Sequence, residues 1–306
     1  MKGVYFESHG GPEVLRYGDR PDPVADAGEV VIDIHAASIN GADWKVRAGL
    51  IGRVKMPHVL GRDFSGVVSA KGSAVDDLRE GDQVFGVCDV GQEGSYAEKL
   101  AISSRLVTIK PAGLTHGQTA ALALTGLTAI VAIEETLRLR PNEQILIHGG
   151  AGGVGGFAIQ LAKHIGARVI TTTSAGNLSY VRSLGADQAI DYREDDFTSL
   201  VSDMDAVFDT VGGEVGLRSF SVLKPGGRAA FIAYGQQIPP APRTDLASLR
   251  PDVRRDRKHL QRIVELVEAS AVRVPEIVSF PLQHAAKAHA ISESRHLRGK
   301  LVLLVR

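Results

Sequence analysis

Three glycines, Gly150, Gly152 and Gly155, constrain the fold of this chain most strongly. They lie in "QILIHGGAGGVGGFAIQLAK", where an apolar strand pattern ends at His148 and an amphipathic helix pattern follows. A G-x-G-x-x-G spacing between a strand and a helix is typical of a dinucleotide-binding turn. The first glycine permits the tight turn, the second leaves room for a diphosphate, and the third lets helix and strand approach closely. A tight turn that binds no ligand is the alternative interpretation.

Strand and helix patterns alternate around this turn. Strand patterns cover 144–150, 167–174, 188–192, 205–213 and 228–235, and helix patterns cover 153–166 and 177–186. Such alternation predicts a parallel sheet covered by helices. A last strand is expected within 246–253, and a helix over 257–270. Two helices are expected ahead of the glycine turn, one opened by a Thr115–Gln118 capping box and a second over 125–140.

The rest of the chain has a different pattern. Up to about residue 110, short β segments are separated by glycine turns, which predicts a small closed antiparallel β domain. The last forty residues return to this pattern, so we expect them to rejoin the first domain. The chain of 306 residues therefore predicts an α/β protein of two domains. A β-barrel domain is expected from 1–114 and 268–306, and a doubly wound parallel-sheet domain from 115–267.

Composition excludes several classes of protein. Lys plus Arg equals Asp plus Glu, 35 each, so no net field attracts nucleic acid or an acidic membrane, and neither is expected as a partner. The N-terminus has no apolar core of signal-peptide length, and no segment approaches the about 20 apolar residues of a spanning helix. We therefore expect a cytoplasmic protein. The single cysteine, Cys88, excludes an internal disulfide and a multi-cysteine zinc cluster.

The residues after the second strand of the predicted sheet indicate which dinucleotide binds. An NAD site usually has an acidic residue there, for the ribose hydroxyls. This chain reads "VITTTSAGN", and the next acid is Asp187, one helix later. Thr173, Ser174 and Asn177 would tolerate a 2′-phosphate, so the sequence favours NADPH. Three arginines are candidate phosphate partners, with ordinary surface charge as the alternative for each: Arg182, Arg193 and Arg295.

Six motifs in order along nearly the whole chain carry a resemblance to a known family. They are "GGPEVL", "INGADWKVRAG", "HVLGRDFSGVV", "LTGLTA", "HGGAGGVG" and "RGKLVLLV". The chain resembles the zinc-independent quinone oxidoreductases, the zeta-crystallin-like family of the medium-chain dehydrogenase/reductase superfamily. The resemblance implies a GroES-like β-barrel catalytic domain, a Rossmann domain, and NADPH-linked reduction of quinones or α,β-unsaturated carbonyls, often in a homodimer.

By this resemblance the segment "SINGADWKVRAG", residues 38–49, faces the nicotinamide. Negative charge grows on the substrate oxygen as hydride arrives, and fixed donors stabilise it. The candidates are the Asn40 amide and a nearby cation, Lys45 or Arg47, with Asp43 orienting them. The alternative is a well-capped helix without chemistry, in which Asn40 is the N-cap, Asp43 lies near the positive end of the helix dipole, and Gly49 follows the C-cap.

The resemblance also implies contacts with the cofactor. Thr125 in "LTGLTA" is expected on the nicotinamide side, or alternatively as a helix N-cap. Tyr234 is expected to touch the nicotinamide or to donate to substrate. The expected cofactor-binding residues are Thr125, Gly150, Ala151, Gly152, Gly153, Val154, Gly155, Thr173, Ser174, Asn177, Tyr192, Val211, Ala233, Gly235 and Arg295.

A metal is not expected. Zinc-dependent relatives have a cysteine near position 40 and a His-Glu pair after a glycine, whereas this chain has Asn40 and, after Gly61, Arg62-Asp63. Arginine cannot ligate a metal. His58 and His148 are expected to make local backbone or core contacts.

Three functions remain open from the sequence. The first is an NADPH-dependent, metal-free reductase of quinones or activated alkenes. The second is an enoyl reductase acting on acyl thioesters of a polyketide or fatty-acyl pathway, and the third is a non-catalytic NADPH-binding sensor or structural protein. Relatives often have a tyrosine, a proton-donor candidate, where this chain has Leu50-Ile51-Gly52, so the proton donor stays open, with solvent as one candidate.

Overall fold

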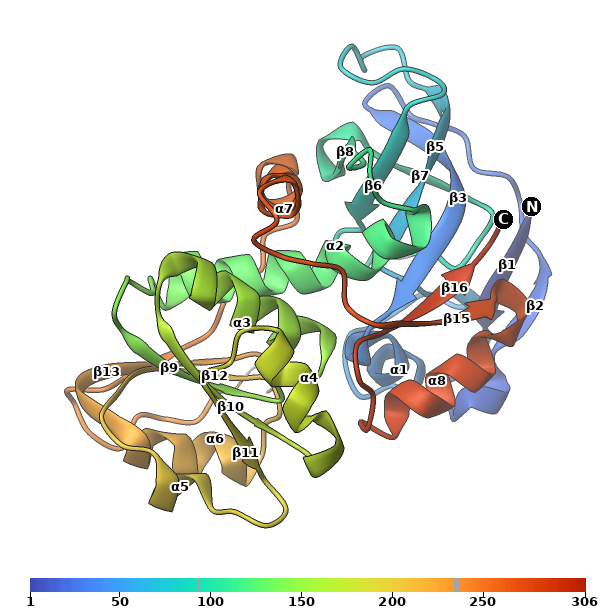
Figure 1. The fold of residues 1–306 in the computed structure, drawn as a ribbon. Helices are drawn as coiled ribbons and strands as arrows, with labels where there is room; N and C mark the ends of the chain where they lie inside the picture. The colour runs from blue at the N-terminus through green and yellow to red at the C-terminus, as the bar shows by residue number, and fades with distance from the viewer. Residues whose placement is uncertain (93, 234–236) are drawn as a thin grey trace. The chain divides into compact units, whose positions relative to one another are not determined.

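A computed structural model describes residues 1–92, 94–233 and 237–306 of the chain (Figure 1). The chain divides into two compact units. Unit 1 comprises Met1–Leu124, Arg255–Glu268 and Val274–Arg306, and unit 2 comprises Thr125–Arg254 and Ala269–Arg273. These limits differ from the predicted domain limits mainly in residues 115–124 and 255–267, which belong to unit 1.

Unit 1 is built on β-sheets. Its strands are β1 (Lys2–Phe6), β2 (Arg16–Asp19), β3 (Glu29–Ile39), β4 (His58–Val59), β5 (Asp63–Lys71), β6 (Gln83–Val87), β7 (Lys99–Ser103), β8 (Val107–Ile109), β15 (Ile277–Pro281) and β16 (Lys300–Leu304). One sheet has the order β15-β16-β3-β5-β6-β8, with β7 also on β3, and a second has the order β2-β1-β4. The helices are α1 (Gly41–Arg47), α7 (Arg257–Glu268) and α8 (Ala285–Glu293).

Strand β3 organises unit 1. Its alternating apolar residues Val30, Ile32 and Ile34 are buried in one core cluster, as a half-buried strand requires. Register shifts after Val31 and Ile34 bend the strand, and β3 pairs with β5, β7 and β16 along its length. The pairing with β16 is antiparallel, so the C-terminal segment returns to unit 1.

Unit 2 contains the predicted parallel sheet. Its strands are β9 (Gln144–His148), β10 (Arg168–Thr173), β11 (Gln188–Asp191), β12 (Met204–Asp209), β13 (Leu223–Phe231) and β14 (Ala247–Leu249), in the order β11-β10-β9-β12-β13-β14. All five pairings are parallel, and β14 is the strand expected within 246–253. Helices α3 (Gly153–Ile165) and α4 (Leu178–Ser183) cover one face, and α5 (Phe197–Leu200) and α6 (Glu214–Ser219) cover the other (Figure 1). The doubly wound prediction is therefore confirmed.

The two helices expected before the glycine turn form one helix, so that prediction was wrong. Helix α2 (His116–Ile130) runs through Thr125 and continues as a π-helical turn, Val131–Thr136. The alanine and leucine residues around Gly126 favour helix strongly enough to offset the about 1 kcal/mol cost of one glycine. Thr125 is consequently not an N-cap. The capping box is confirmed, because the Thr115 amide donates to the Gln118 side chain and the Gln118 amide donates to the Thr115 hydroxyl.

Because these segments join, His116–Thr136 is long and apolar enough to cross a membrane by length and composition alone. The expectation that no segment approaches such a length therefore fails for this helix. Of its most apolar window, 78% is buried inside the protein. Core helices of soluble proteins meet the same criterion, so the finding is weak support for a membrane span.

Arg47 joins α1 to α8. Its fully buried guanidinium donates to the Gly10 carbonyl at 3.1 Å, to Nδ1 of His289 at 3.1 Å and to Glu293 at 2.8 Å. Burial, and next the charge of Arg47, lower the pKa of His289 to about 3, so His289 is a neutral acceptor. Each of the three guanidinium nitrogens of Arg47 thus has a protein partner. This favours a structural role for Arg47 over a catalytic one.

Replacing Arg47 by methionine should destabilise the protein. The substitution leaves the partly buried Gly10 carbonyl and the buried His289 Nδ1 without their donor, so we expect a loss of about 2–4 kcal/mol in the free energy of unfolding, measured in urea. Arg53→Met, at an exposed position of the same unit, is the control and should change it by less than about 0.5 kcal/mol. Equal effects of the two variants would contradict this role.

Candidate active site and cofactor site

The glycine turn of unit 2 has the geometry that a diphosphate requires. A Cβ added at Gly150 would lie 2.1 Å from the Thr171 hydroxyl, and one at Gly155 would lie 2.3 Å from the Gly149 carbonyl. These two glycines therefore allow close packing of the turn and of α3. A Cβ at Gly152 would meet its nearest atom only at 3.5 Å, so nothing inside the protein requires glycine there. The open space at Gly152 fits an incoming phosphate group.

Helix α3 begins directly after this turn, with Gly152 as its N-cap residue. The first amides of a helix have no carbonyl one turn earlier to donate to, so they can bind an anion. Ala151 lies in the turn, and Gly153 and Val154 are the first residues of the helix. These neighbours of Gly152 therefore lie at the N-terminal end of α3, and their contacts with a diphosphate stay a prediction.

His148, the last residue of β9, stabilises the glycine turn that follows it. The Ser219 hydroxyl donates to the Val215 carbonyl, so it accepts from His148 Nε2 at 3.0 Å, and His148 Nδ1 accepts from the Thr172 hydroxyl at 2.9 Å. Burial, and next the charge of Arg218, lower the pKa of His148 to about 3, which keeps the ring neutral. His148 makes the expected local contacts. His58, also buried, packs edge-on against Phe6.

The residues expected near the 2′-phosphate gather at the ends of β10 and β11. Ser174 follows β10, and its hydroxyl accepts from the side-chain amide of Asn177 at 3.1 Å. The backbone amide of Tyr192 donates to the Thr173 carbonyl at 3.1 Å, which holds the two strand ends together. The Arg193 guanidinium lies over the exposed ring of Tyr192, 5.8 Å from its centroid. Hydroxyl, amide and guanidinium groups in this position fit a phosphate better than a ribose diol.

Two more predicted residues lie beyond β12 and β13. The Asp209 carboxylate accepts from the amides of Val211 and Gly212, which fixes the turn after β12. A Cβ at Gly212 would lie 3.0 Å from that of Ala233, so this turn and the end of β13 are neighbours. Val211 is exposed, so its side chain is accessible to a ligand. Tyr234 and Gly235 lie outside the described residues. Thr125 is buried within α2.

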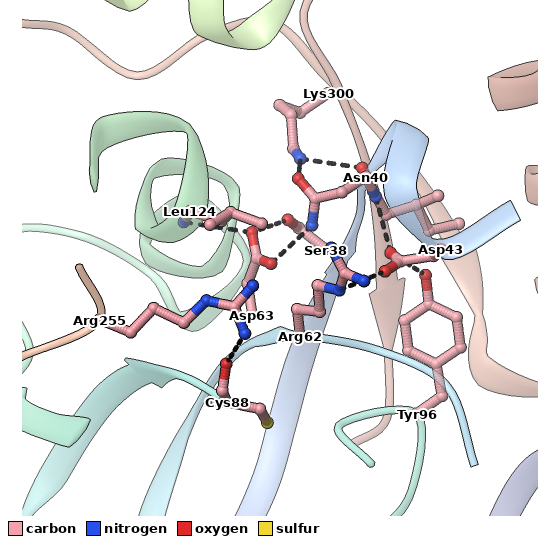
Figure 2. A network of polar contacts seen from close by, with 11 residues as sticks. Ser38, Asn40, Asp43, Arg62, Asp63, Cys88, Tyr96, Leu124, Arg255 and Lys300 are labelled. Atoms are coloured by element: carbon pink, nitrogen blue, oxygen red, sulfur yellow. Dashed lines mark hydrogen bonds and ion pairs between the residues drawn. The ribbon is translucent and has the colours of Figure 1, made fainter. Parts of the chain in front are cut away.

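In unit 1, the side chain of Asn40 lies between two charged residues (Figure 2). Its Nδ2 donates to Asp63 Oδ1 at 2.6 Å, and its Oδ1 accepts from Lys300 Nζ at 2.7 Å. Asn40 is also the N-cap residue of α1, and its backbone amide donates to Asp43 Oδ2 at 2.8 Å. Gly49 follows the C-cap with φ +74°, as the capping interpretation expected. The capping interpretation of Asn40 is therefore confirmed, and its role in the reaction stays a prediction.

Asp63 and Lys300 are buried and fully engaged. Asp63 also accepts from the Ser38 hydroxyl at 2.7 Å and from the Leu124 amide at 3.3 Å, and Lys300 donates to the Ile39 carbonyl at 2.8 Å. Burial raises the pKa of Asp63, and the nearby ammonium of Lys300 opposes this rise. Burial lowers the pKa of Lys300, and the nearby carboxylates oppose the fall. We call Ser38, Asn40, Asp63 and Lys300 the Asn40 network.

Asp43 lies beside this network. Its side chain is 1% exposed, and it accepts from the Tyr96 hydroxyl at 2.9 Å. Arg62 Nε lies 3.7 Å from its other oxygen. Burial raises the pKa of Asp43 to about 6, with Arg62 opposing the rise and Asp63 adding to it. Burial also raises the pKa of Tyr96, which keeps its hydroxyl as a donor.

Lys45 and Arg295 do not join the Asn40 network. The Lys45 ammonium and the Arg295 guanidinium lie over the ring of Trp44, 5.8 and 5.6 Å from its centroid. Burial, and next the charge of Arg295, lower the pKa of Lys45. The cation on Asn40 is Lys300, which the sequence reasoning missed. The signal for it was a lysine at the start of the otherwise apolar segment "KLVLL".

The groups around Asn40 do not fit zinc. Both ends of its amide have protein partners, and the neighbouring ammonium of Lys300 and guanidinium of Arg62 repel a cation. Within 1–92, 94–233 and 237–306, no group of three His, Cys, Asp or Glu residues is placed to hold a metal ion. That this chain works without a metal stays a prediction.

Comparisons with known proteins agree with this architecture. Residues 26–135 match the family model "Alcohol dehydrogenase GroES-like domain", and residues 184–303 match "Zinc-binding dehydrogenase". The chain is 34% identical to the NADPH-dependent alkenal/one oxidoreductase of Arabidopsis thaliana, over 99% of this chain and 79% of that protein.

Two solved structures are similar over the full chain. The quinone oxidoreductase from Coxiella burnetii is 37% identical, with a TM-score of 0.94 over 100% of this chain and 99% of that one. The Escherichia coli quinone oxidoreductase complexed with NADPH is 29% identical, with a TM-score of 0.91 over 100% of both chains. This chain belongs to the quinone oxidoreductase family of the medium-chain dehydrogenase/reductase superfamily.

Two alanine substitutions should separate the roles of the glycines. The Cβ of Gly152→Ala would make only an ordinary van der Waals contact, 3.5 Å from the Gly149 carbonyl oxygen, so we expect unfolding stability within about 0.5 kcal/mol of wild type and an NADPH Kd raised at least about tenfold. Gly155→Ala, its matched control, places a Cβ against the backbone and should cost about 2 kcal/mol or more in stability. Unchanged NADPH binding by Gly152→Ala, measured by fluorescence titration, would contradict a diphosphate at this turn.

Asp43 should make stability depend on pH. The unfolded carboxyl titrates near about pH 4, and the folded one at about 6, so folding favours the protonated form. The cost of the buried charge is absent below about pH 4 and complete above about pH 6. Between these values, wild-type stability should fall relative to Asp43→Asn by up to about 3 kcal/mol. Parallel stability curves for the two proteins, from urea unfolding across this range, would show that Asp43 carries no such cost.

Proposed function

We propose that this protein uses NADPH to reduce a quinone or an α,β-unsaturated carbonyl compound. The observation that carries the proposal is the Asn40 amide, a neutral donor fixed between Asp63 and Lys300 in the segment by which family members face the nicotinamide. The relative from Arabidopsis thaliana is named for alkenal and enone reduction with NADPH, and the two structural neighbours are named quinone oxidoreductases. We also propose a cytoplasmic location and, by the family resemblance, a homodimer.

Bound NADPH supplies the hydride. Asn40 donates a hydrogen bond to the substrate oxygen, where negative charge grows as the acceptor is reduced. Asp43 fixes the backbone of Asn40, and Tyr96 fixes Asp43. This chain has no tyrosine at 50–52, where relatives often have one, and we propose solvent as the source of the proton for the α-carbon of an enone or the oxygens of a quinone.

A substrate screen with NADPH and NADH in parallel tests this function. We expect steady oxidation of NADPH with a quinone or an enone, and a kcat/KM at least about tenfold lower with NADH, because no acidic residue follows β10 to bind the ribose hydroxyls. A clear preference for enoyl thioesters would favour the enoyl-reductase alternative. Tight NADPH binding without turnover on any acceptor would favour a sensor or structural protein.

Removing the amide of Asn40 should slow the chemical step. We expect Asn40→Ala to lower kcat by about 10²–10³-fold, the usual effect of losing one donor to a developing oxyanion. The NADPH Kd should change less than about twofold, because the glycine turn is intact. Asn142→Gly, at a turn of unit 2 with φ +67°, is the control and should leave kcat unchanged. A wild-type kcat in Asn40→Ala would remove Asn40 from the reaction.

A further inference from the structure

The Asn40 amide lies between two buried, oppositely charged side chains. The Asp63 carboxylate accepts from its Nδ2 at 2.6 Å, and the Lys300 ammonium donates to its Oδ1 at 2.7 Å. Both charged residues are almost completely buried, whereas Asn40 is partly exposed. The amide therefore connects two interior side chains of opposite charge and is itself partly exposed at the surface of unit 1.

This arrangement permits one orientation of the amide. Turned by 180°, its oxygen would face the Asp63 carboxylate and its NH₂ group would face the Lys300 ammonium. An acceptor would then meet an acceptor, and a donor would meet a donor, each next to a full charge in a medium of low dielectric constant. An asparagine with only one of these partners would lack this double restriction.

The charged partners cannot easily move away. Asp63 is held by the Ser38 hydroxyl and the Leu124 amide, and Lys300 by the Ile39 carbonyl. The three elements that carry Asn40, Asp63 and Lys300 are also fixed to one another. Strand β3 pairs with β5 at Ser38–Asp63 and with β16 at Ile39–Leu301.

One donor of the amide is left over. The Asn40 NH₂ group has two hydrogens, and one points to Asp63. No other residue in the described part of the chain accepts the second. The carboxylate and the ammonium both draw the amide toward its charge-separated form, which makes the remaining N–H a stronger donor.

We propose that Asp63 and Lys300 are positioning residues, which hold the Asn40 amide in one orientation and leave its second N–H directed at the oxygen of the substrate. The inference rests on the proposed function and deepens it, because it assigns a role to two residues distant from Asn40 in sequence. Neither needs to touch the substrate. Their effect passes through Asn40 and should be seen in kcat more than in cofactor binding.

Substitutions of Lys300, with a matched lysine as control, test the role of the ammonium. Lys300→Met should lower kcat at least tenfold with a quinone or enone while the NADPH Kd changes less than twofold, and Lys300→Arg, which keeps the charge, should recover most of the rate. Lys110 is also buried in unit 1, but its ammonium donates to the carbonyls of Pro111 and Leu114. Lys110→Met should therefore lower the melting temperature and leave kcat within twofold of wild type.

An exchange of amide and carboxylate tests the role of Asp63. Asp63→Asn keeps only one acceptor oxygen for Asn40, Ser38 and Leu124 and removes the charge that holds the Asn40 NH₂ group, so we expect kcat to fall at least tenfold. In the double variant Asn40→Asp with Asp63→Asn, the new carboxylate accepts from Lys300 and from the new amide. The double variant should recover the melting temperature lost by Asp63→Asn, but not kcat, because no amide N–H faces the substrate.

The outcomes are distinct. The proposal is wrong if Lys300→Met keeps the wild-type kcat, if Lys300→Arg is as slow as Lys300→Met, or if the double variant recovers turnover. Should Lys300→Met not fold, the Asp63→Asn pair decides the question by the same criteria. If the wild-type protein fails to oxidise NADPH with any quinone or enone tested, the proposed function itself is refuted.

Discussion

The contact on which this site depends is an amide placed between two buried charges. Asp63 and Lys300 would be costly to bury alone, because transfer of a charged group out of water is unfavourable. Their hydrogen bonds to Asn40, Ser38 and Ile39 offset that cost. The network also explains why the end of β3 and the starts of β5 and β16 meet at one point. The same contacts that satisfy the buried charges fix the orientation of a surface-reaching donor.

This constraint connects structure to chemistry. A reductase without a bound cation must stabilise negative charge on the substrate oxygen with groups that are already oriented. Asn40 meets that condition, whereas Lys45 and Arg295 lie over the Trp44 ring and are not held by the network. In unit 2, the open space at Gly152 and the polar side chains after β10 fit the diphosphate and 2′-phosphate of NADPH. The two units thus carry separate parts of one proposed reaction.

Local patterns in the sequence predicted much of the fold. The glycine turn, the Thr115–Gln118 capping box and the caps of α1 depend on residues within a few positions of one another. The Asn40 network does not, because Lys300 is 260 residues from Asn40 and nothing local indicates that they pair. Arg47 contacts α8 across a similar distance in sequence. The two helices expected at 115–140 joined into one because the threonine-glycine pair at 125–126 was not enough to interrupt an apolar helical segment.

We propose that fixed organic dipoles, and no bound metal, polarise the acceptor. The most direct test is to measure the transition-metal content of the purified, active protein together with its rate of NADPH oxidation before and after dialysis against a chelator. We expect far less than one metal ion per chain and an unchanged rate with a quinone or enone. One zinc ion per chain, whose removal abolishes turnover and whose return restores it, would show that a metal polarises the acceptor instead.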